Sequence, residues 1–173
     1  MIARAGTKAV LCLVVVCAAL LPARAFQLDS PAWPQPGIDF HVVIPDQSDV
    51  FNAAFVEAID RWNDSSAFTF TKISDSADPC NDPNDNPAIN GVGFAALACG
   101  DEPFDETTLA ITQSWSSSRR IQSGIVFNTA FTWGVYSGPR QQSSVDMRRV
   151  AVHELGHAIG LGHTTAVSIM QPN

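Results

Sequence analysis

Two segments of the chain place hydrophobic side chains at the three- and four-residue spacing of an amphipathic helix. The first covers residues 48–63. Its apolar stripe consists of Phe51, Phe55, Ala58 and Trp62. The second begins at Ser143 or Ser144, where Asp146 completes an S-x-x-D capping pattern, and it runs to about Gly160. Its buried stripe is expected to be Met147, Ala151, Leu155 and Ala158.

Further segments have the β-branched and aromatic composition that is typical of strands. They cover residues 38–44, 67–73, 91–99, 107–115 and 121–127. The segment 67–73 reads Ala-Phe-Thr-Phe-Thr-Lys-Ile and alternates with a period of two. His41, in the first of these segments, is interpreted as a structural residue. Because no internal repeat is found, these elements indicate a single domain that contains both helices and strands.

The first 25 residues are predicted to be a signal peptide. A positively charged start precedes an apolar run from Ala9 to Leu21, which is shorter than a membrane span. Ala23-Arg24-Ala25 matches an A-x-A cleavage site, so the mature chain is expected to begin at Phe26. Residues 26–36 are rich in proline and are expected to form an extended leader. Residues 26–173 are then long enough for one folded domain.

The charge balance argues against nucleic acid as a partner. The formal net charge is −7, and it becomes −10 when Arg4, Lys8 and Arg24 are removed with the signal peptide. The acidic side chains then far outnumber the basic ones, which leaves no surface suited to phosphate. The signal peptide further predicts a secreted or periplasmic protein that is not held at a membrane after cleavage.

Cys80 and Cys99 are the cysteines that remain in the mature chain, and a secretory signal implies an oxidising compartment. We therefore expect a disulfide that closes the loop between them. Residues 74–90, in this region, are rich in Asp, Asn and Pro. Their oxygens suit either a solvated turn or a Ca²⁺ ion, although the D-x-D-x-D-G order of a calcium loop is missing.

The strongest chemical signal is the run His-Glu-Leu-Gly-His-Ala-Ile-Gly-Leu-Gly-His from His153 to His163. His153 and His157 are four residues apart and share one face of a helix, so both can bind one metal ion. Gly160 allows the chain to leave the helix with positive φ, which brings in His163 as a third ligand. Three protein ligands leave an open position, as in catalytic zinc sites, and Glu154 suits a general base beside the ion.

This run and the later segment Ser168-Ile169-Met170-Gln171-Pro172 resemble the signature of the metzincin clan of zinc endopeptidases, in which a Met-turn follows the zinc motif. Within the clan, the residues before His153, the segment 160–164 and Met170-Gln171-Pro172 look most like a matrixin of the small secreted type found in bacteria. Astacins and serralysins carry Tyr two residues after the Met, where this chain has Pro172. The strong similarity covers residues 147–172, and weaker similarity runs back to about residue 37.

The resemblance implies an α+β fold with a twisted, mostly parallel sheet, an antiparallel edge strand, two main helices and a zinc site on the second helix. It implies one catalytic Zn²⁺ held by His153, His157 and His163, with Glu154 as the general base and Met170 in the Met-turn. The edge strand would roof the cleft and bind an extended substrate, unless it is an ordinary interior strand. The substrate-binding residues in this strand would be Leu109, Ala110 and Ile111.

Two departures from the matrixin pattern lead to further expectations. Matrixins carry a second, structural zinc held by His in the region of residues 74–90, where this chain has no His, so that ion is expected to be absent. Matrixins also continue beyond Met-x-Pro into a wall of the S1′ pocket and a closing helix. Because the sequence ends at Asn173, the domain 26–173 is expected to be truncated after the Met-turn.

The predicted function is that of a secreted zinc endopeptidase, which hydrolyses peptide bonds through zinc-bound water with Glu154 as the base. The expected partner is a protein or peptide substrate, and the chain is expected to be a monomer. The alternative is a non-catalytic zinc-binding or interaction protein, or an inactive fragment of such a protease. The presence of Glu154 favours the enzyme, because a structural zinc does not need it.

Overall fold

The computed structural model describes residues 26–29 and 31–172, so the predicted signal peptide lies outside the described residues. The helices are α1 (Asp49–Ser65) and α2 (Met147–Ile159). The longer strands are β2 (Gly37–His41), β3 (Thr69–Ile73), β4 (Gly91–Ala95), β5 (Ala110–Ser116) and β6 (Arg120–Asn128). The two-residue strands are β1 (Gln27–Leu28), β7 (Trp133–Gly134), β8 (Val145–Asp146) and β9 (Leu161–Gly162).

The strands confirm the expected mixture of parallel pairing with one antiparallel edge. β2 and β3 pair in parallel and are connected by α1, while β4 is parallel to β6. β5 is antiparallel to β6 and lies at the edge of the order β4-β6-β5. The longer strands form two sheets, β2-β3 and β4-β6-β5, which meet where His41 N donates to Asn90 O (2.9 Å). The predicted α+β fold is therefore confirmed, with its sheet divided at this junction.

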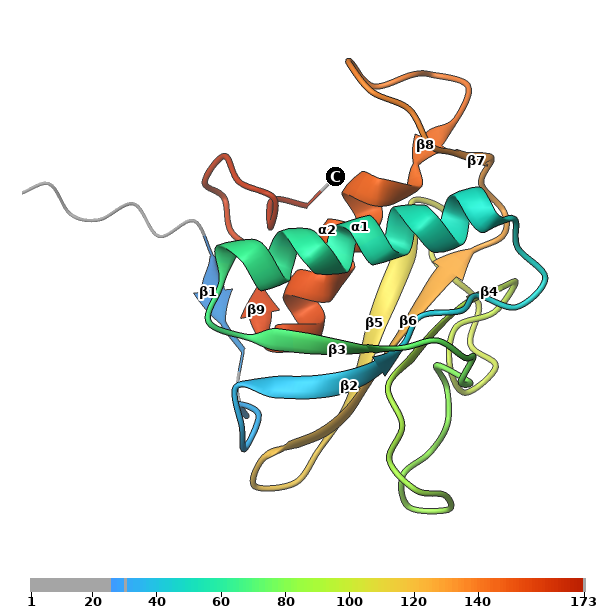
Figure 1. Cartoon of the computed structure of the whole chain (residues 1–173). Coiled ribbons are helices and arrows are strands. Elements are labelled where there is room, and N and C mark those ends of the chain that lie inside the picture. The colour runs from blue at the N-terminus through green and yellow to red at the C-terminus, as the bar shows by residue number, and fades with distance from the viewer. Residues whose placement is uncertain (1–25, 30, 173) are drawn as a thin grey trace, which may run out of the picture.

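The apolar stripe of α1 faces the core as its spacing predicts. Phe55 and Ala58 are fully buried, and Phe51 and Trp62 are half-buried beside them. The helix ends at Ser65, slightly later than the pattern indicates. Trp62 Nε1 donates to Val152 O (2.8 Å), which ties α1 to α2. Figure 1 shows α1 crossing in front of α2, above the pair β2 and β3.

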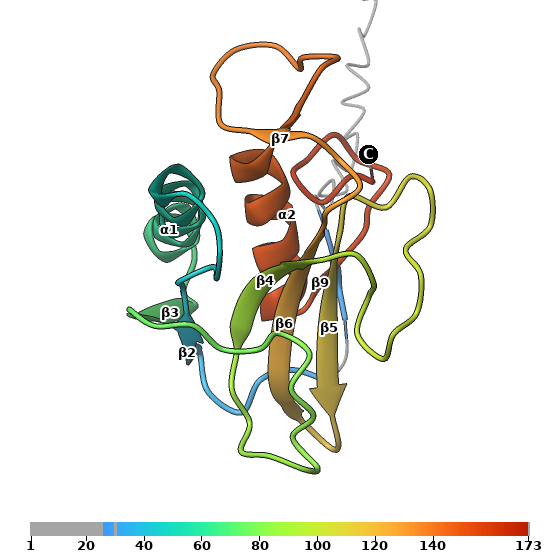
Figure 2. The same cartoon turned by 90° about the vertical axis from the view of Figure 1, so that its right-hand side faces the viewer.

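α2 is the central element of the molecule. It packs against α1 on one side and against β5 and β6 on the other (Figure 2). Its predicted stripe of Met147, Ala151, Leu155 and Ala158 is fully buried. The predicted capping by Ser143 or Ser144 is wrong. Asp146 is the N-cap, because Val145 and Asp146 first pair with Trp133 and Gly134 as β8 and β7 and so delay the helix.

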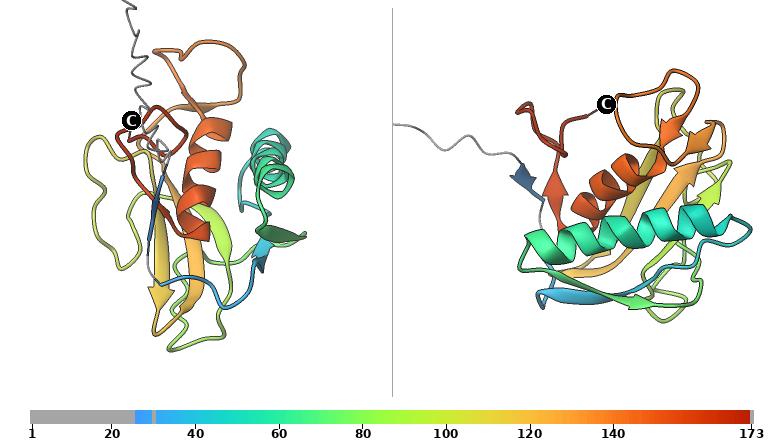
Figure 3. Two further views of the ribbon diagram at one scale, coloured as in Figure 1. Left: turned by 90° about the vertical axis from the view of Figure 1, so that its left-hand side faces the viewer. Right: turned by 45° about the horizontal axis from the view of Figure 1, so that its top comes forward.

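The leader does more than extend along the surface. Gln27 and Leu28 form β1, which pairs antiparallel with Leu161 and Gly162 of β9, the segment directly after α2 (Figure 3). Asp29 N then donates to Gly160 O (2.7 Å). The beginning of the described chain is therefore attached to the end of the helix that carries the histidine motif.

The expected disulfide joins the loop before β4 to the loop after it. Cys80 and Cys99 are bonded, with 5.1 Å between their Cα atoms. His41 Nδ1 pairs with the carboxylate of Asp75 on the neighbouring segment. No helix within the described residues is both long and apolar enough to cross a membrane.

Candidate metal centre

The histidine motif forms a compact cluster of nitrogen atoms at the end of α2. His153 and His157 lie on one face of the helix, and Gly160 at φ 103° ends the helix and turns the chain toward His163. The Nε2 atoms of His153 and His157 are 3.0 Å apart, and each is 3.1 Å from Nε2 of His163. Nitrogens this close together can all reach one ion at the roughly 2.0–2.1 Å that is usual for zinc.

Backbone carbonyls determine the protonation of two of these rings. His153 Nδ1 is 2.7 Å from Ile169 O, and His157 Nδ1 is 2.7 Å from Leu161 O. A carbonyl only accepts hydrogen bonds, so each Nδ1 carries the proton and each Nε2 keeps its lone pair. Burial lowers the pKa of His153 and lowers that of His157 to about 4. Neutral imidazoles with converging lone pairs fit a bound cation.

Glu154 lies beside the histidine cluster and is nearly fully buried. Its Oε2 accepts a hydrogen bond from Thr112 Oγ1 on β5 (2.7 Å). Burial raises the pKa of Glu154 to about 7, and the hydrogen bond from Thr112 opposes that rise. A carboxylate with a pKa near neutrality suits a general base, which must both accept and release a proton. Thr112 was not singled out from the sequence, although it directly follows Leu109–Ile111 on the strand that was expected to bind substrate.

Met170 packs directly against α2. A Cβ added at Gly156 would lie 2.4 Å from Met170 Sδ, so the absence of a side chain at Gly156 is what admits the methionine. Met170 is fully buried, and its carbonyl accepts a hydrogen bond from Thr164 N (3.1 Å). The turn 168–172 therefore connects the residue after His163 with the carbonyl of Ile169, which orients His153.

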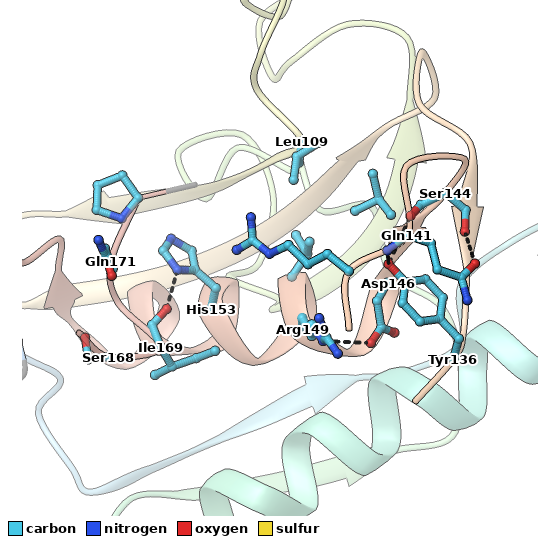
Figure 4. Close-up of a pocket in the computed structure, with 14 residues that line it drawn as sticks. Leu109, Tyr136, Gln141, Ser144, Asp146, Arg149, His153, Ser168, Ile169 and Gln171 are labelled. Atoms are coloured by element: carbon cyan, nitrogen blue, oxygen red, sulfur yellow. Dashed lines mark hydrogen bonds and ion pairs between the residues drawn. The ribbon is translucent and has the colours of Figure 1, made fainter. Parts of the chain in front are cut away.

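Two hollows flank His153. The first, which we call the histidine cavity, measures about 530 Å³ and is lined by all three histidines, Glu154 and Thr112. The second, the loop cavity, measures about 500 Å³ and lies among the first turns of α2, the segment 136–146 and the turn 168–172 (Figure 4). Leu109, Val150, His153 and Pro172 line both hollows, which therefore join into one cleft.

The residues expected to bind substrate lie at this cleft. Ala110 and Ile111 are in β5 and line the histidine cavity with Leu109. Leu109 lies just before the strand rather than within it, although its carbonyl still accepts from Asn128 N (2.9 Å). β5 is an edge strand and not an interior one, since no described strand pairs with its outer side.

Arg120 supports the far end of the site and was missed by the sequence reasoning. It is buried at the start of β6, and its Nη1 donates to His157 O (3.0 Å) at the C-terminus of α2. Burial lowers its pKa, and the nearby carboxylate of Asp29 opposes that change. A cation at a helix C-terminus stabilises the unpaired carbonyls there. The roles of Arg120 and Asp29 could not be assigned from sequence, because each residue comes from a segment far from the histidine motif.

The acidic loop has no comparable cluster. Within the described part of the chain, His153, His157 and His163 form the only group of three or more His, Cys, Asp or Glu whose ligand atoms converge. Asp78 and Asp82 instead accept hydrogen bonds from the backbone of Cys80 and Asn84. The geometry of residues 74–90 is thus that of the turn interpretation, and the calcium interpretation finds no support.

Arg148 and Arg149, at the start of α2, are both ion-paired. Arg148 pairs with Glu57 of α1 (3.2 Å), and Arg149 Nε lies 3.2 Å from Asp146 Oδ2. The pair of Arg149 and Asp146 lies in the wall of the loop cavity, as Figure 4 shows. This placement of two charged groups beside the histidine cluster could not be read from the helical pattern alone.

Comparison with known proteins places the chain in a family. Residues 37–173 match the family described as Matrixin. Metalloendoproteinase 2-MMP of Arabidopsis thaliana is 29% identical over 82% of this chain and 37% of its own length. Human Stromelysin-3 is 24% identical over 85% of this chain and 28% of its own length.

The chain therefore spans about a third of the length of these relatives. Among solved structures, that of myroilysin has a TM-score of 0.40 and 16% identity, and the match covers 76% of this chain and 52% of that chain. The family match covers most of the chain, including both helices, the cleft and the histidine cluster. This protein belongs to the matrixin family.

Proposed function

We propose that this protein is a zinc endopeptidase that hydrolyses peptide bonds in proteins. The observation that carries the proposal is the convergence of the Nε2 atoms of His153, His157 and His163 beside the buried carboxylate of Glu154. A zinc ion bound there would supply Lewis acidity, which makes water a better nucleophile and polarises a carbonyl. Membership in the matrixin family supports this choice of metal and reaction.

The roles of the protein groups follow from their positions. Glu154 would accept the proton of the attacking water and then donate it to the leaving amine. Thr112 would act as a positioning residue, since its hydroxyl holds Glu154 Oε2 at 2.7 Å. Burial of Glu154 would exclude bulk water from the carboxylate and keep its proton affinity high.

The edge strand β5 provides a means of binding the substrate. An extended peptide can add to the unpaired side of this strand through main-chain hydrogen bonds. Leu109, Ala110 and Ile111 line the histidine cavity, so a peptide bound along them would pass over the histidine cluster. Main-chain hydrogen bonds of this kind can form with peptides of many sequences. Any preference for particular side chains would then depend on the cavities.

The proposal is tested with purified protein and casein as the substrate. Hydrolysis should stop when zinc is chelated and return when zinc is restored. Glu154→Gln should retain one zinc per chain, measured by elemental analysis, and lose nearly all turnover. Glu102→Gln removes an exposed carboxylate far from the motif in sequence. This control should retain both the bound zinc and the wild-type turnover. Glu154→Gln with wild-type turnover would contradict the mechanism, and a folded, zinc-loaded wild type without turnover would favour the non-catalytic zinc-binding alternative.

We further propose that the protein acts outside the cytoplasm as a monomer. The disulfide between Cys80 and Cys99 supports the first part, because such bonds persist in oxidising compartments. The predicted cleavage after Ala25 supports it independently. Cell fractionation with N-terminal sequencing tests the location, and a mature chain that does not begin at Phe26 would contradict the predicted cleavage site. Sedimentation tests the monomer.

A further inference from the structure

The segment between His157 and His163 is the part of the histidine motif with the greatest backbone freedom. It contains Gly160, which ends α2 at φ 103°, and Gly162, which directly precedes the third histidine. Glycine loses more conformational freedom on folding than any other residue, so ordering this segment for metal binding costs free energy. His153 differs, because it lies inside α2, where the helix itself fixes the backbone.

The leader (residues 26–36) pairs with all three residues that separate α2 from His163. β1 is antiparallel to β9, and the residue directly after β1 adds a further bond, in which Asp29 N donates to Gly160 O (2.7 Å). Figure 3 shows β1 beside β9 near the end of α2. A Cβ at Gly162 would lie 2.7 Å from Asp29 Oδ1, so the absence of a side chain there admits the leader. The leader therefore restrains the flexible segment that carries the third histidine.

The leader also provides a hydrogen-bond donor to the last turn of α2. The last four carbonyls of a helix have no partner within the helix. Trp33 Nε1 donates to the carbonyl of Ala158, the residue after His157 (2.7 Å). Ala32 O accepts from the backbone N of Arg120 (3.0 Å), whose side chain in turn donates to His157 O (3.0 Å). The leader and Arg120 therefore supply partners for two consecutive carbonyls at the end of α2.

We propose that the leader is a positioning element of the metal centre, in which Trp33 and β1 hold the end of α2 and the turn to His163 in the geometry that binds zinc. Trp33 lines neither the histidine cavity nor the loop cavity, so it acts through α2 and not on a substrate. This inference rests on the proposed zinc site and is independent of the proposed hydrolysis. Loss of groups that orient metal ligands typically lowers metal affinity about 10–100-fold.

The first test compares two identical substitutions at two tryptophans. Trp33→Phe removes the indole N–H and retains a ring that can pack near Phe68, which lies 6.4 Å from the Trp33 ring between centroids. Trp133→Phe is the matched control. Trp133 is also half-buried, its Nε1 also donates to a backbone carbonyl, that of Asn128 (2.9 Å), and it lines neither cavity.

Both variants lose one hydrogen bond to a backbone carbonyl, so the zinc-free proteins should lose similar stability in urea. The dissociation constant for zinc, measured by competition with a chromophoric chelator, should rise about tenfold in Trp33→Phe and stay at the wild-type value in Trp133→Phe. Circular dichroism establishes that each zinc-free protein is folded in this assay. A Trp33→Phe variant that loses stability but retains the wild-type dissociation constant would overturn the inference, because the leader would then be only a structural support.

The second test uses the unaltered protein and does not depend on any variant. If the leader strengthens zinc binding, zinc must strengthen the docking of the leader by the same factor. Hydrogen exchange is therefore measured with and without zinc at the amide of Asp29. The reference is the amide of Val145, which donates to Thr132 O (2.8 Å) near the other end of α2.

Zinc should slow exchange at Asp29 about tenfold more than at Val145. Equal slowing at both amides would reflect general stabilisation of the fold and would overturn the inference. A wild type that binds no zinc would contradict the inference and the proposed function together. A zinc affinity that depends on Trp33, in a protein that does not hydrolyse casein, would support the inference and contradict the peptidase function alone.

Discussion

Replacement of Gly156 by alanine should destabilise this protein, although the same change usually stabilises a helix. Gly156 lies inside α2, where alanine is favoured over glycine by about 1 kcal/mol. The added Cβ would lie 2.4 Å from Met170 Sδ, 3.1 Å from Met170 Cε and 3.2 Å from Trp62 Cζ2. Real Cβ atoms do not approach other heavy atoms to 2.4 Å, so the methionine must move.

The free-energy cost of moving Met170 decides whether Gly156→Ala stabilises or destabilises the protein. Met170 is 1% exposed and is enclosed by the turn 168–172 and α2, so its side chain has little space into which it can move. Overpacking of a well-packed core costs typically about 1–3 kcal/mol. After subtraction of the helix-propensity gain, Gly156→Ala should lower the free energy of unfolding by about 1 kcal/mol and Tm by about 2–4 °C.

The assay is urea unfolding of wild type, Gly156→Ala, Met170→Ala and the double variant. Met170→Ala alone should cost about 2–5 kcal/mol because it leaves a cavity. In that background the Cβ finds space, so Gly156→Ala should become neutral or stabilising. Ala53→Gly, at an exposed position of α1, measures the propensity difference in this protein without a steric contact. Zinc affinity should also fall about tenfold in Gly156→Ala, since a displaced Met170 moves Ile169 O away from His153.

Two results would refute this reasoning. If Gly156→Ala stabilises the wild type by the amount that Ala53→Gly costs, the contact with Met170 imposes no strain. If the effect of Gly156→Ala is the same with and without the methionine side chain, the two residues are not coupled and the destabilisation has another origin.

Further predictions concern the helix cap, the disulfide and pH. Because Asp146 caps α2, Asp146→Ala should lower the free energy of unfolding, measured in urea, by about 2 kcal/mol. Ser143→Ala should lower it by under about 0.5 kcal/mol. Equal losses in the two variants would refute the assignment of Asp146 as the cap. Replacement of both Cys80 and Cys99 by alanine should lower the free energy of unfolding by about 3 kcal/mol. An unchanged free energy of unfolding would contradict a stabilising disulfide. In zinc-free protein, Glu154 with a pKa raised to about 7 binds its proton more tightly when folded, so its contribution to stability is present below pH 4.5 and is lost as pH rises through 7. Between these pH values the free energy of unfolding of the wild type should therefore fall by up to about 3 kcal/mol relative to that of Glu154→Gln. If the two proteins' free energies of unfolding change with pH in parallel, the raised pKa is contradicted.

The elements with a regular local pattern could be located from sequence to within a few residues. α1 and α2 are amphipathic over several turns, and most of the residues of their stripes are buried. The errors lie where distant segments compete for the same residues. Val145 and Asp146 pair with β7 before α2 can begin, and β1 uses Gln27 and Leu28 from a leader that has no strand pattern. Propensity has no information about such partners.

The candidate site divides in the same way. The histidine cluster could be predicted because its ligands lie on one helix and the turn that follows it, so their spacing alone brings them together. Thr112 and Arg120 could not, because they reach Glu154 and His157 only through the packing of α2 on β5 and β6. A single hydroxyl or guanidinium on a strand carries no periodic signal that separates it from its neighbours.

The histidine cluster and the loop cavity are built from different parts of the chain, so substitutions can affect them separately. The three histidines depend on local helical geometry. The loop cavity depends instead on Leu109 and on the segments 136–146 and 168–172, which share no sequence pattern. His153 belongs to both, since its Nε2 faces the other histidines and its ring lines the loop cavity. Substitutions in the segment 136–141 can therefore change the shape of the loop cavity without moving the three histidines. Substitutions at Met170 or Gly156 act on Ile169 O and His153, so they should change metal binding and side-chain preference together.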